Sequence, residues 1–282
     1  MLAITGSGGF LGKKFIEYSK THLKEKVFKL PKIIKKNKFN EFYFKKNKLS
    51  DYLIKKKINC IIHFAGVRKN VCEENYTFAK KSIFDLTKNI CNQILVSKLD
   101  ILFIYISTDH VFDGSTKLYQ EKNSINKRPK TKLGKLKLTT ENYIAEKLRK
   151  FSIIRLSAVM DDPRLSSFVK KSLKNKTKLD LFSNVFFSPV LSHDLNRLIK
   201  VIKNKKFENE VFHCSGNKRL SKYSFYSELF NNKKNFIKKK LLDFRFNPHD
   251  LSLSNKKTCK TLKIKMTNFK KSLNICKKAF NI

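Results

Sequence analysis

The sequence predicts an α/β protein built on a doubly wound parallel sheet. Short apolar runs bounded by turn residues alternate along the 282-residue chain with longer amphipathic stretches, which is the pattern of successive βαβ units. A glycine-rich turn directly follows the first apolar run, where the first strand should pass into the first helix. A chain of this length buries a sizeable core, as one large domain or as a domain with a smaller lobe. Seven runs are the predicted strands: Met1–Thr5, Lys26–Leu30, Glu41–Phe44, Cys60–Phe64, Ile101–Ser107, Ser152–Leu156 and Val211–Cys214.

The helices are expected between these strands. Phe78, Ile83, Leu86, Ile90 and Ile94 recur near helical spacing and predict a helix over residues 75–98. The lysine-rich segment 30–40 is expected to form a short loop or a frayed helix. Further helices are predicted over three segments: Lys137–Lys150, Ser166–Lys176 and Ser221–Leu229.

Basic residues dominate the charge of the chain. There are 63 Lys and Arg against 22 Asp and Glu, which gives a formal net charge of +41. A surplus of this size attracts nucleic acid, anionic membranes and phosphorylated ligands. The lysines are spread over the whole length, however, without an isolated basic arm or a basic stripe interleaved with aromatics. We therefore expect no specific nucleic-acid binding, because Lys simply fills solvated positions, whereas a phosphate-bearing ligand is compatible with the charge.

The cysteines and the hydropathy predict a protein of the reducing cytoplasm. No two of the six cysteines form a Cys-x-x-Cys pair or have a His at metal-ligand spacing, so free, mostly buried thiols and no metal site are expected. No apolar run reaches the ~18 residues of a membrane span, and the apolar start runs into glycines rather than forming a signal peptide. The expected location is therefore cytoplasmic, without a membrane partner. The six residues are Cys60, Cys72, Cys91, Cys214, Cys259 and Cys276.

The run GSGGFLG, residues 6–12, carries the first chemical signal. Between a strand and a helix, Gly6 permits a tight turn, Gly9 lets the backbone approach a pyrophosphate, and Gly12 lets the helix pack on the strand. The helix then directs its amino end at the anion, so Phe10 and Leu11 join the three glycines as predicted cofactor-binding residues. The fold is accordingly expected to be a Rossmann-type dinucleotide-binding domain.

The end of the second predicted strand indicates which dinucleotide is bound. An acidic residue usually holds the adenosine ribose hydroxyls there, yet this strand ends VFKLPK, residues 27–32, without a carboxylate. Lys29 or Lys32 could instead meet a 2′-phosphate. The sequence therefore favours NADP(H) over NAD(H).

The third buried strand ends in small residues. The run CIIHFAG, residues 60–66, reaches the carboxyl edge of the sheet, where a doubly wound fold binds its ligand. Ala65 and Gly66 would let a cofactor lie close and are predicted cofactor-binding residues. His63 stands alone on an apolar strand and is interpreted as a core histidine with satisfied hydrogen bonds.

The densest signal consists of the runs YISTDHVFDG (105–114), YQE (119–121) and PKTKLGKLKLTTE (129–141). Together they resemble the dTDP-4-dehydrorhamnose reductase branch of the extended short-chain dehydrogenases. That branch carries a Ser-Thr-Asp-Tyr-Val-Phe-Asp-Gly block, a Pro-Tyr-x-Glu turn and a Tyr-Gly-x-Ser-Lys-Leu-x-Gly-Glu segment. The resemblance continues over most of the chain through RLS (155–157), FV (168–169), FSPV (187–190), HDL (193–195), VFHCSG (211–216) and the segment from Arg245 to Leu262.

The resemblance implies an NAD(P)-dependent reductase of a keto sugar nucleotide, as in dTDP-rhamnose and surface-polysaccharide biosynthesis. Residues 1–160 would form the dinucleotide-binding domain, with later strands from about 185–215, and residues 161–282 most of a small C-terminal substrate-binding lobe. The implied partner is a nucleoside-diphosphate sugar, and a homodimer is left open. Four basic residues are available for its pyrophosphate: Arg155, Arg164, Lys170 and Arg245.

The resemblance also implies the catalytic residues. In that family a Ser or Thr binds the substrate carbonyl, a Tyr donates the proton, and a Lys four residues later holds the nicotinamide ribose and lowers the Tyr pKa. Thr108, with Ser107 beside it as a cofactor-binding residue, is the carbonyl-binding hydroxyl, and Lys137 is the lysine that serves both catalysis and cofactor binding. The tyrosine position holds Leu133, which has no proton to give.

Three accounts of the missing tyrosine remain open. Catalysis is lost or weak, and the protein is a binding or regulatory relative; or a reductase persists with another donor, such as water, Thr131 or Tyr119. In the third account Tyr143 and Lys147 take over, although they would lie ~15 Å along the same helix. His110, which replaces the tyrosine of the Asp-Tyr-Val-Phe motif, is either a substitute acid or a loop residue standing in for an aromatic.

Overall fold

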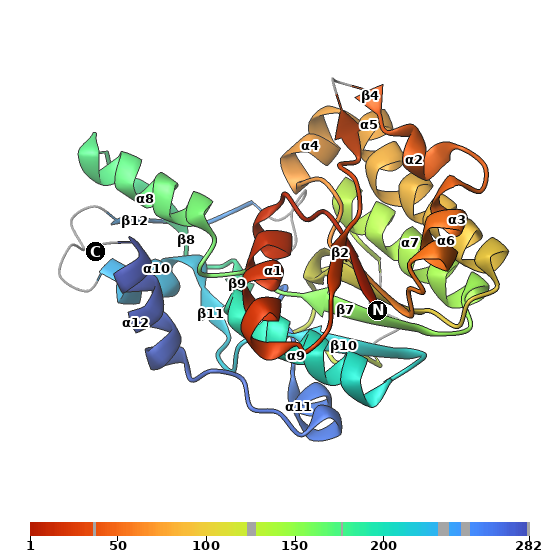
Figure 1. Ribbon diagram of the computed structural model, residues 1–282. Helices are drawn as coiled ribbons and strands as arrows, with labels where there is room; N and C mark the ends of the chain where they lie inside the picture. The colour runs from red at the N-terminus through yellow and green to blue at the C-terminus, as the bar shows by residue number, and fades with distance from the viewer. Residues whose placement is uncertain (36–37, 123–127, 176, 231–236, 244–248, 281–282) are drawn as a thin grey trace. The chain divides into compact units, whose positions relative to one another are not determined.

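A six-stranded sheet is the centre of the computed structural model, which describes residues 1–35, 38–122, 128–175, 177–230, 237–243 and 249–280 (Figure 1). The strand order is β10-β7-β6-β5-β1-β2, and the pairs from β2 to β6 are parallel. This topology confirms the predicted doubly wound α/β class and six of the seven predicted strands. The strands are β1 (Leu2–Thr5), β2 (Val27–Lys29), β5 (Cys60–His63), β6 (Leu102–Thr108), β7 (Phe151–Leu156) and β10 (Glu210–Cys214).

The strand prediction for Glu41–Phe44 is wrong, because these residues form the short helix α2. Asn40 caps it by accepting the Phe42 N–H at 3.0 Å. Phe42 and Tyr43 are neighbours in the chain, and both are buried. In a strand, neighbouring side chains point to opposite faces, so one face could bury only one of the two. The loop or frayed helix expected over 30–40 is also wrong in part, since β3 (Ile34–Lys35) and β4 (Lys38–Phe39) pair antiparallel; residues 36–37 lie outside the described residues.

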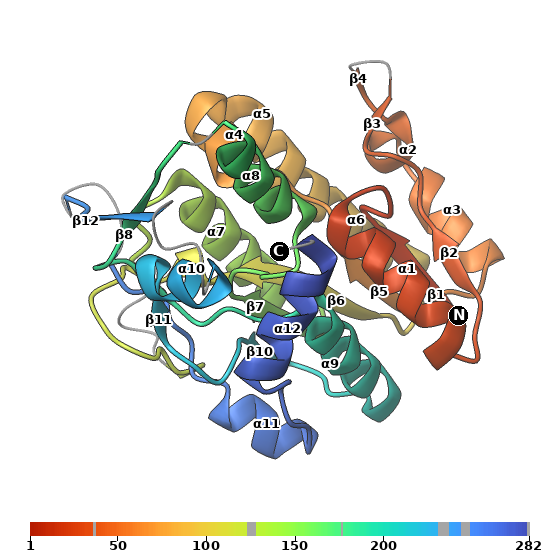
Figure 2. The same ribbon diagram turned by 90° about the vertical axis from the view of Figure 1, so that its left-hand side faces the viewer.

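Helices cover the sheet on both sides. Helices α3 (Lys48–Lys55), α6 (Leu86–Ser97) and α7 (Lys132–Lys147) lie beside one another on one side, with α6 in contact with both others (Figure 1). On the other side, α1 (Phe10–His22) and α9 (Ser192–Lys205) lie together in Figure 1 and Figure 2, and the Asn196 side chain donates to the Lys14 carbonyl at 3.2 Å.

The predicted helix over 75–98 is confirmed as three consecutive segments. They are α5 (Tyr76–Lys80), a π-helical turn η1 (Lys81–Asp85) and α6, preceded by α4 (Lys69–Glu74). Helix α7 starts at Lys132, five residues before the predicted start at Lys137, because Thr131 caps it by accepting the Gly134 N–H at 3.0 Å.

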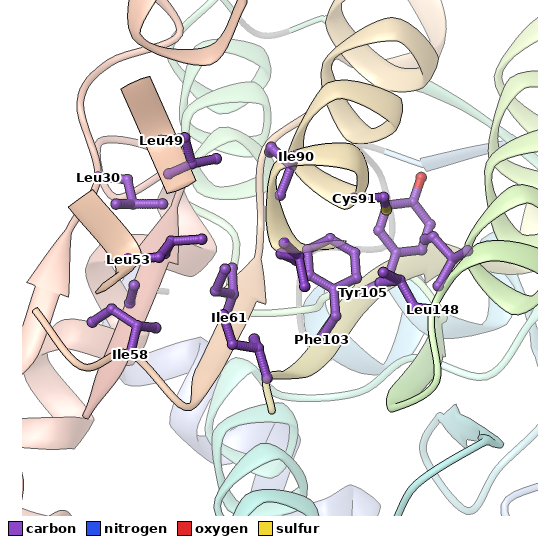
Figure 3. Packing of buried hydrophobic residues seen from close by; sticks show 14 of the residues in the cluster. Leu30, Leu49, Leu53, Ile58, Ile61, Ile90, Cys91, Phe103, Tyr105 and Leu148 are labelled. Atoms are coloured by element: carbon purple, nitrogen blue, oxygen red, sulfur yellow. The ribbon is translucent and has the colours of Figure 1, made fainter. Parts of the chain in front are cut away.

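The main core lies between the sheet and the helices on the α3–α6–α7 side (Figure 3). Strands β5 and β6 are buried over nearly their whole length, as expected for strands covered on both faces. The core is mostly aliphatic with a few aromatics, which makes burial of apolar area the main contribution to its stability. Figure 3 labels Leu30, Leu49, Leu53, Ile58, Ile61, Ile90, Cys91, Phe103, Tyr105 and Leu148.

The chain divides into two compact units. The first comprises residues 1–111, 131–155 and 196–212, and the second comprises 112–130, 156–195 and 213–282. The assignment of a cofactor-binding and a substrate-binding role to residues before and after 160 stays a prediction. The second unit contains β8 (Leu179–Phe182), β9 (Phe186–Phe187), β11 (Leu220–Ser221), β12 (Ile237–Lys240), α8 (Pro163–Lys174), α10 (Lys222–Phe230), α11 (Lys256–Leu262) and α12 (Phe269–Phe280).

The second unit has its own core, in which α10 and α12 pack together with β8. Its helices α8 and α10 confirm the helices predicted over 166–176 and 221–229. Among the described residues, none of the helices combines the length and the hydropathy that crossing a bilayer requires.

All six cysteines are free thiols, as predicted, and five of them are buried. Burial raises the pKa of Cys60, Cys91 and Cys276 to about 12. Because the thiolate is the reactive form, these three thiols are chemically inert packing residues.

Candidate functional site

The glycine-rich turn joins β1 to α1 and is shaped by two steric requirements. Gly6 has φ +67°, and a Cβ there would lie 2.8 Å from the Ala65 nitrogen. A Cβ on Gly12 would lie 2.3 Å from the Gly6 oxygen, so only glycine lets α1 start this close to the strand. The turn is closed by the Gly9 N–H, which donates to the Gly6 carbonyl at 3.0 Å.

The outer side of the same turn is bare. A Cβ on Gly8 would meet nothing within 4 Å, and one on Gly9 would only touch the Gly6 oxygen at 3.4 Å. Gly9 is the N-cap of α1, and no side chain in the described part of the protein caps that end. The first amides of α1 are therefore oriented to accept an anion. Phe10 and Leu11, the first two helical residues, are partly exposed beside this end.

The end of β2 carries two exposed lysines. Lys29 closes the strand and Lys32 follows it by three residues, and both side chains are exposed. The Leu30 N–H donates to the Ile4 carbonyl at 2.9 Å, which holds this end of β2 alongside β1 and hence near the glycine-rich turn. The end of β2, where the adenosine ribose is predicted to bind, therefore carries positive charge.

His63 is a core histidine, as predicted. Its ring contacts Thr5 Oγ1 at 2.8 Å through Nδ1 and Thr87 Oγ1 at 3.1 Å through Nε2. The Thr87 hydroxyl donates to the Ile83 carbonyl at 2.6 Å, so it accepts from Nε2–H, and Nδ1 accepts from Thr5. Burial lowers the pKa of His63 to about 3, and the neutral ring links the start of the glycine turn to the π-helical turn. Ala65 follows two residues later, and its N–H donates to Thr5 Oγ1 at 3.3 Å.

The buried, neutral His63 makes the free energy of unfolding decrease as the pH falls. Between about pH 6.5 and 3 the unfolded chain binds a proton that the folded protein does not, so stability falls as the pH falls, by up to about 1.4 kcal/mol per pH unit. We expect His63→Gln to be less stable than the parent at pH 7.5 and to show a flatter loss between pH 6.5 and 4.5. Urea unfolding at several pH values measures both, and parallel curves for the two proteins would contradict this role.

Lys137 is buried on α7, one turn after Leu133. Its Nζ donates to the Ile106 carbonyl at 2.8 Å and lies 4.5 Å from the ring centre of Tyr105. A Cβ on Gly66 would be 3.6 Å from the same Nζ, so the ammonium lies beside the small residues that end β5. Burial lowers the pKa of Lys137 to about 8, while the charge of Glu141 acts in the opposite direction.

Glu141 organises a buried polar network. Arg155 donates to it through Nε at 3.2 Å and through a terminal nitrogen at 2.8 Å, and the Ser107 hydroxyl donates to it at 2.5 Å. The side chains of Glu141 and Arg155 are 4% and 2% exposed, so this pair is sealed from solvent. The role of Arg155 as a pyrophosphate ligand is therefore wrong. The role of Ser107 stays a prediction, with its hydroxyl directed into the protein.

The other basic candidates lie in the second unit. Arg164 is half exposed and its guanidinium binds Asp162, with Nε to Oδ1 at 2.7 Å. Lys170 is exposed on α8. Arg245 lies outside the described residues.

Thr108 ends β6, and the 3₁₀ turn η2 (Asp109–Val111) follows it. The Thr108 hydroxyl donates to Asp109 Oδ1 at 3.0 Å and accepts the His110 N–H at 3.3 Å. It is partly exposed and two residues beyond Ile106, whose carbonyl holds Lys137. Thr108 and Lys137 are thus brought to the same end of β6, where the hydroxyl can rotate toward a ligand.

Leu133 is built into an apolar cluster rather than left beside an empty space. Its side chain, 9% exposed, packs with Cys72, Ala79, Ile83 and Leu136 from α4, α5, η1 and α7. Hydrophobic burial of this kind stabilises the leucine where it stands. Leu133 therefore supports the packing around the site, but it has no proton to donate.

The other hydroxyls considered as donors are engaged elsewhere. Tyr119 in the second unit is fully buried and donates to Asp113 at 2.5 Å. Tyr143 donates to Asn92 at 2.8 Å, and it lies on the same helix as Leu133, so it is a helix residue remote from the predicted site. Thr131 is buried at the start of α7, where its oxygen accepts the Gly134 N–H and lies 3.4 Å from His110 Nδ1.

Sequence reasoning missed the partners that hold the site together. Thr5 and Thr87, which bind His63, belong to no recognisable sequence motif. The only sequence signal for either is the position of Thr5 at the end of the first predicted strand, just before the glycines. Glu141 stands at the end of the family motif, but its pairing with Arg155 is not predicted, because a buried ion pair leaves no local sequence pattern.

Comparison with known proteins places the chain in a family. Residues 1–281 match the family described as RmlD substrate binding domain, and the chain belongs to that family, which confirms the resemblance read from the sequence. The family comprises NAD(P)-dependent reductases that take nucleotide sugars.

Solved structures show the same fold over the whole chain. A dTDP-4-dehydrorhamnose reductase from Clostridium acetobutylicum superposes with a TM-score of 0.84 at 22% identity, covering 100% of this chain and 99% of that one. The enzyme from Bacillus anthracis, in complex with NADP, gives 0.81 at 19% identity over 97% and 96% of the two chains.

Curated relatives match over part of their length. Methionine adenosyltransferase 2 subunit beta from Bos taurus is 26% identical over 174 residues, covering 58% of this chain and 51% of that protein. The same subunit from Xenopus tropicalis is 25% identical over 180 residues, 59% of this chain and 52% of that protein. The chain thus spans about half the length of the curated relatives it matches.

Proposed function

We propose that the protein is an NADP(H)-dependent reductase of a keto sugar nucleotide, similar to dTDP-4-dehydrorhamnose reductase, that works slowly because the tyrosine is replaced by Leu133. The observation that supports it most is the placement of Lys137. Its ammonium lies beside Gly66 and is held by the strand that ends in Thr108. A protein that no longer used a nicotinamide would gain stability by replacing this buried charge with an apolar side chain.

The residues present fit a dinucleotide. The bare outer side of Gly8 and Gly9 and the open amino end of α1 would take the pyrophosphate, beside Phe10 and Leu11. Ala65 and Gly66 leave room at the end of β5, and Lys137 would hold the nicotinamide ribose. When bound, the reduced cofactor supplies a hydride. Thr108 would bind the sugar carbonyl and orient it, and orientation alone contributes a large part of such a rate.

The preference for NADP(H) has its own test. Replacing both Lys29 and Lys32 with Ala is expected to weaken NADPH binding by roughly three- to tenfold, the range for exposed phosphate contacts, and to leave NADH binding unchanged. Fluorescence titration measures both affinities. Lys88→Ala combined with Lys55→Ala, two exposed lysines on α6 and α3, is the control that removes the same amount of charge. An equal loss for NADH, or no loss for NADPH, would remove the basis for this preference.

The reductase itself is tested by incubating the protein with NADPH and a dTDP-4-keto-6-deoxy sugar and following the absorbance of NADPH. We expect slow, protein-dependent oxidation that needs the sugar. NADPH binding without any oxidation contradicts the slow reductase. If Leu133→Tyr creates no oxidation either, the proposed substrate class fails as well.

A second candidate is a non-catalytic binding or regulatory subunit that retains the cofactor fold. Two observations favour it: Leu133 is packed as an ordinary core residue, and the curated relatives are named as a subunit of another enzyme. This candidate predicts NADPH bound without oxidation and co-purification of an enzyme whose activity changes when the protein is added. Turnover of a keto sugar nucleotide would argue against it.

A further inference from the structure

A reductase without the tyrosine still needs a proton for the alcohol oxygen. The nearby hydroxyls do not supply it: Ser107 donates to the buried Glu141, and Thr108, which would bind the carbonyl, is an aliphatic alcohol that keeps its proton near neutral pH. Leu133 has an apolar side chain. The proton must therefore come from a titratable side chain at the same edge of the sheet.

His110 is such a group. It lies in η2, directly after the strand that ends in Thr108, and η2 packs against α7. Its backbone N–H donates to Thr108 Oγ1 at 3.3 Å, and its side chain is partly exposed. The backbone of His110 thus lies beside the predicted carbonyl-binding hydroxyl, in the turn that follows β6, and its ring contacts Thr131 at the start of the helix that carries Leu133 and Lys137.

The ring is oriented by the cap of that helix. His110 Nδ1 lies 3.4 Å from Thr131 Oγ1, and this oxygen already accepts the Gly134 N–H. Between a neutral ring and the Thr131 hydroxyl either group can donate, because the hydroxyl has its own proton and a second lone pair. In the charged ring Nδ1–H donates to the same oxygen, so one orientation serves both protonation states.

The charged groups around the turn come from three elements. Asp109 is buried in the turn itself. Lys132 opens α7 next to Thr131, and Glu73 of α4 accepts the Lys132 N–H at 3.1 Å.

We propose that His110 is the proton donor of the reduction and so takes the part of the missing tyrosine. The inference rests on the proposed reductase function. A bound reduced nicotinamide would supply a hydride to the carbonyl carbon, the carbonyl π pair would move to oxygen, and the His110 imidazolium would give its proton to that oxygen. The products are the alcohol, oxidised cofactor and neutral His110, which regains a proton from water.

The test compares three proteins at pH 6.5 with NADPH and the keto sugar nucleotide: the parent, His110→Ala and His110→Tyr. The tyrosine variant restores the residue of the family motif and is the control for folding. We expect kcat to fall at least tenfold in both variants, because general acids contribute about 10²–10⁴ in rate, while NADPH affinity stays within about twofold. Added imidazole should restore part of the activity of His110→Ala and none of that of His110→Tyr, whose ring fills the space.

Each outcome decides the proposal. A parent that turns over while His110→Ala keeps its rate, or loses it without rescue by imidazole, overturns the role of His110 and leaves the reductase standing. A parent without turnover also overturns it. In that case Leu133→Tyr separates the causes: an active variant means that the substrate class is right and the donor absent, and an inactive one means that the proposed function itself has failed.

Discussion

Replacing Leu133 with tyrosine is expected to raise kcat for keto sugar reduction by about tenfold or more at pH 7.5. The new hydroxyl would lie one helical turn from Lys137, whose charge lowers the pKa of a neighbouring phenol toward the working pH. Lys137 has a pKa of about 8 and is still mostly charged at pH 7.5. The gain should shrink above pH 8, because the lysine then loses the charge that assists the phenol. Steady-state kinetics at pH 7.5 and 9 measure this.

Leu133→Phe is the matched control for the tyrosine. It adds the same ring to the cluster of Cys72, Ala79 and Ile83 and costs a similar repacking energy, of about 1–3 kcal/mol for an overfilled core. Only the hydroxyl distinguishes the two variants. If both raise kcat equally, or if neither changes it while both bind NADPH, the missing proton at position 133 is not what limits the reaction.

Removing the Glu141 carboxylate should produce the largest loss of stability. In Glu141→Leu the Arg155 guanidinium, 2% exposed, stays buried opposite an apolar side chain, and breaking a buried pair in this way costs about 3–5 kcal/mol. The Ser107 hydroxyl loses its acceptor as well. We expect this loss in the free energy of unfolding measured with urea.

Two further variants test the reason for that loss. Arg155→Met combined with Glu141→Leu should recover most of the stability, since no unpaired charge remains. Glu146→Ala, on the same helix, removes an exposed ion pair with Lys147 and should change the free energy of unfolding by less than about 0.5 kcal/mol. A Glu141→Leu protein as stable as the parent would show that the network does not support the fold as the geometry indicates.

The parts of the fold that sequence predicts well are those encoded locally. The glycine-rich turn follows from its position between an apolar run and a helix, and the structure gives Gly6 and Gly12 backbone positions that no other residue fits. The place of Leu133 followed from spacing within one motif, which α7 carries on a single helix. The helix over 75–98 followed from apolar periodicity, although periodicity does not reveal the π-helical turn within it.

The errors arise where local preference and tertiary context disagree. Aromatic residues favour strands, so Glu41–Phe44 was predicted as one, while the cap at Asn40 selected a helix. The pairing of Arg155 with Glu141 joins a strand to the helix before it, and no spacing rule announces such a contact. The same holds for the contact of His110 with Thr131, which joins η2 to the start of α7.

The most direct test of the account is the transfer of deuterium from NADPH deuterated at the reactive position of the nicotinamide to the sugar of a dTDP-4-keto-6-deoxy substrate, followed by mass spectrometry. The account predicts deuterium in the sugar alcohol formed by the unmodified protein, slowly but in proportion to protein concentration, and faster with Leu133→Tyr. A protein that binds NADPH yet transfers no deuterium, while Leu133→Tyr does, would contradict the claim that this chain still reduces its substrate without the tyrosine.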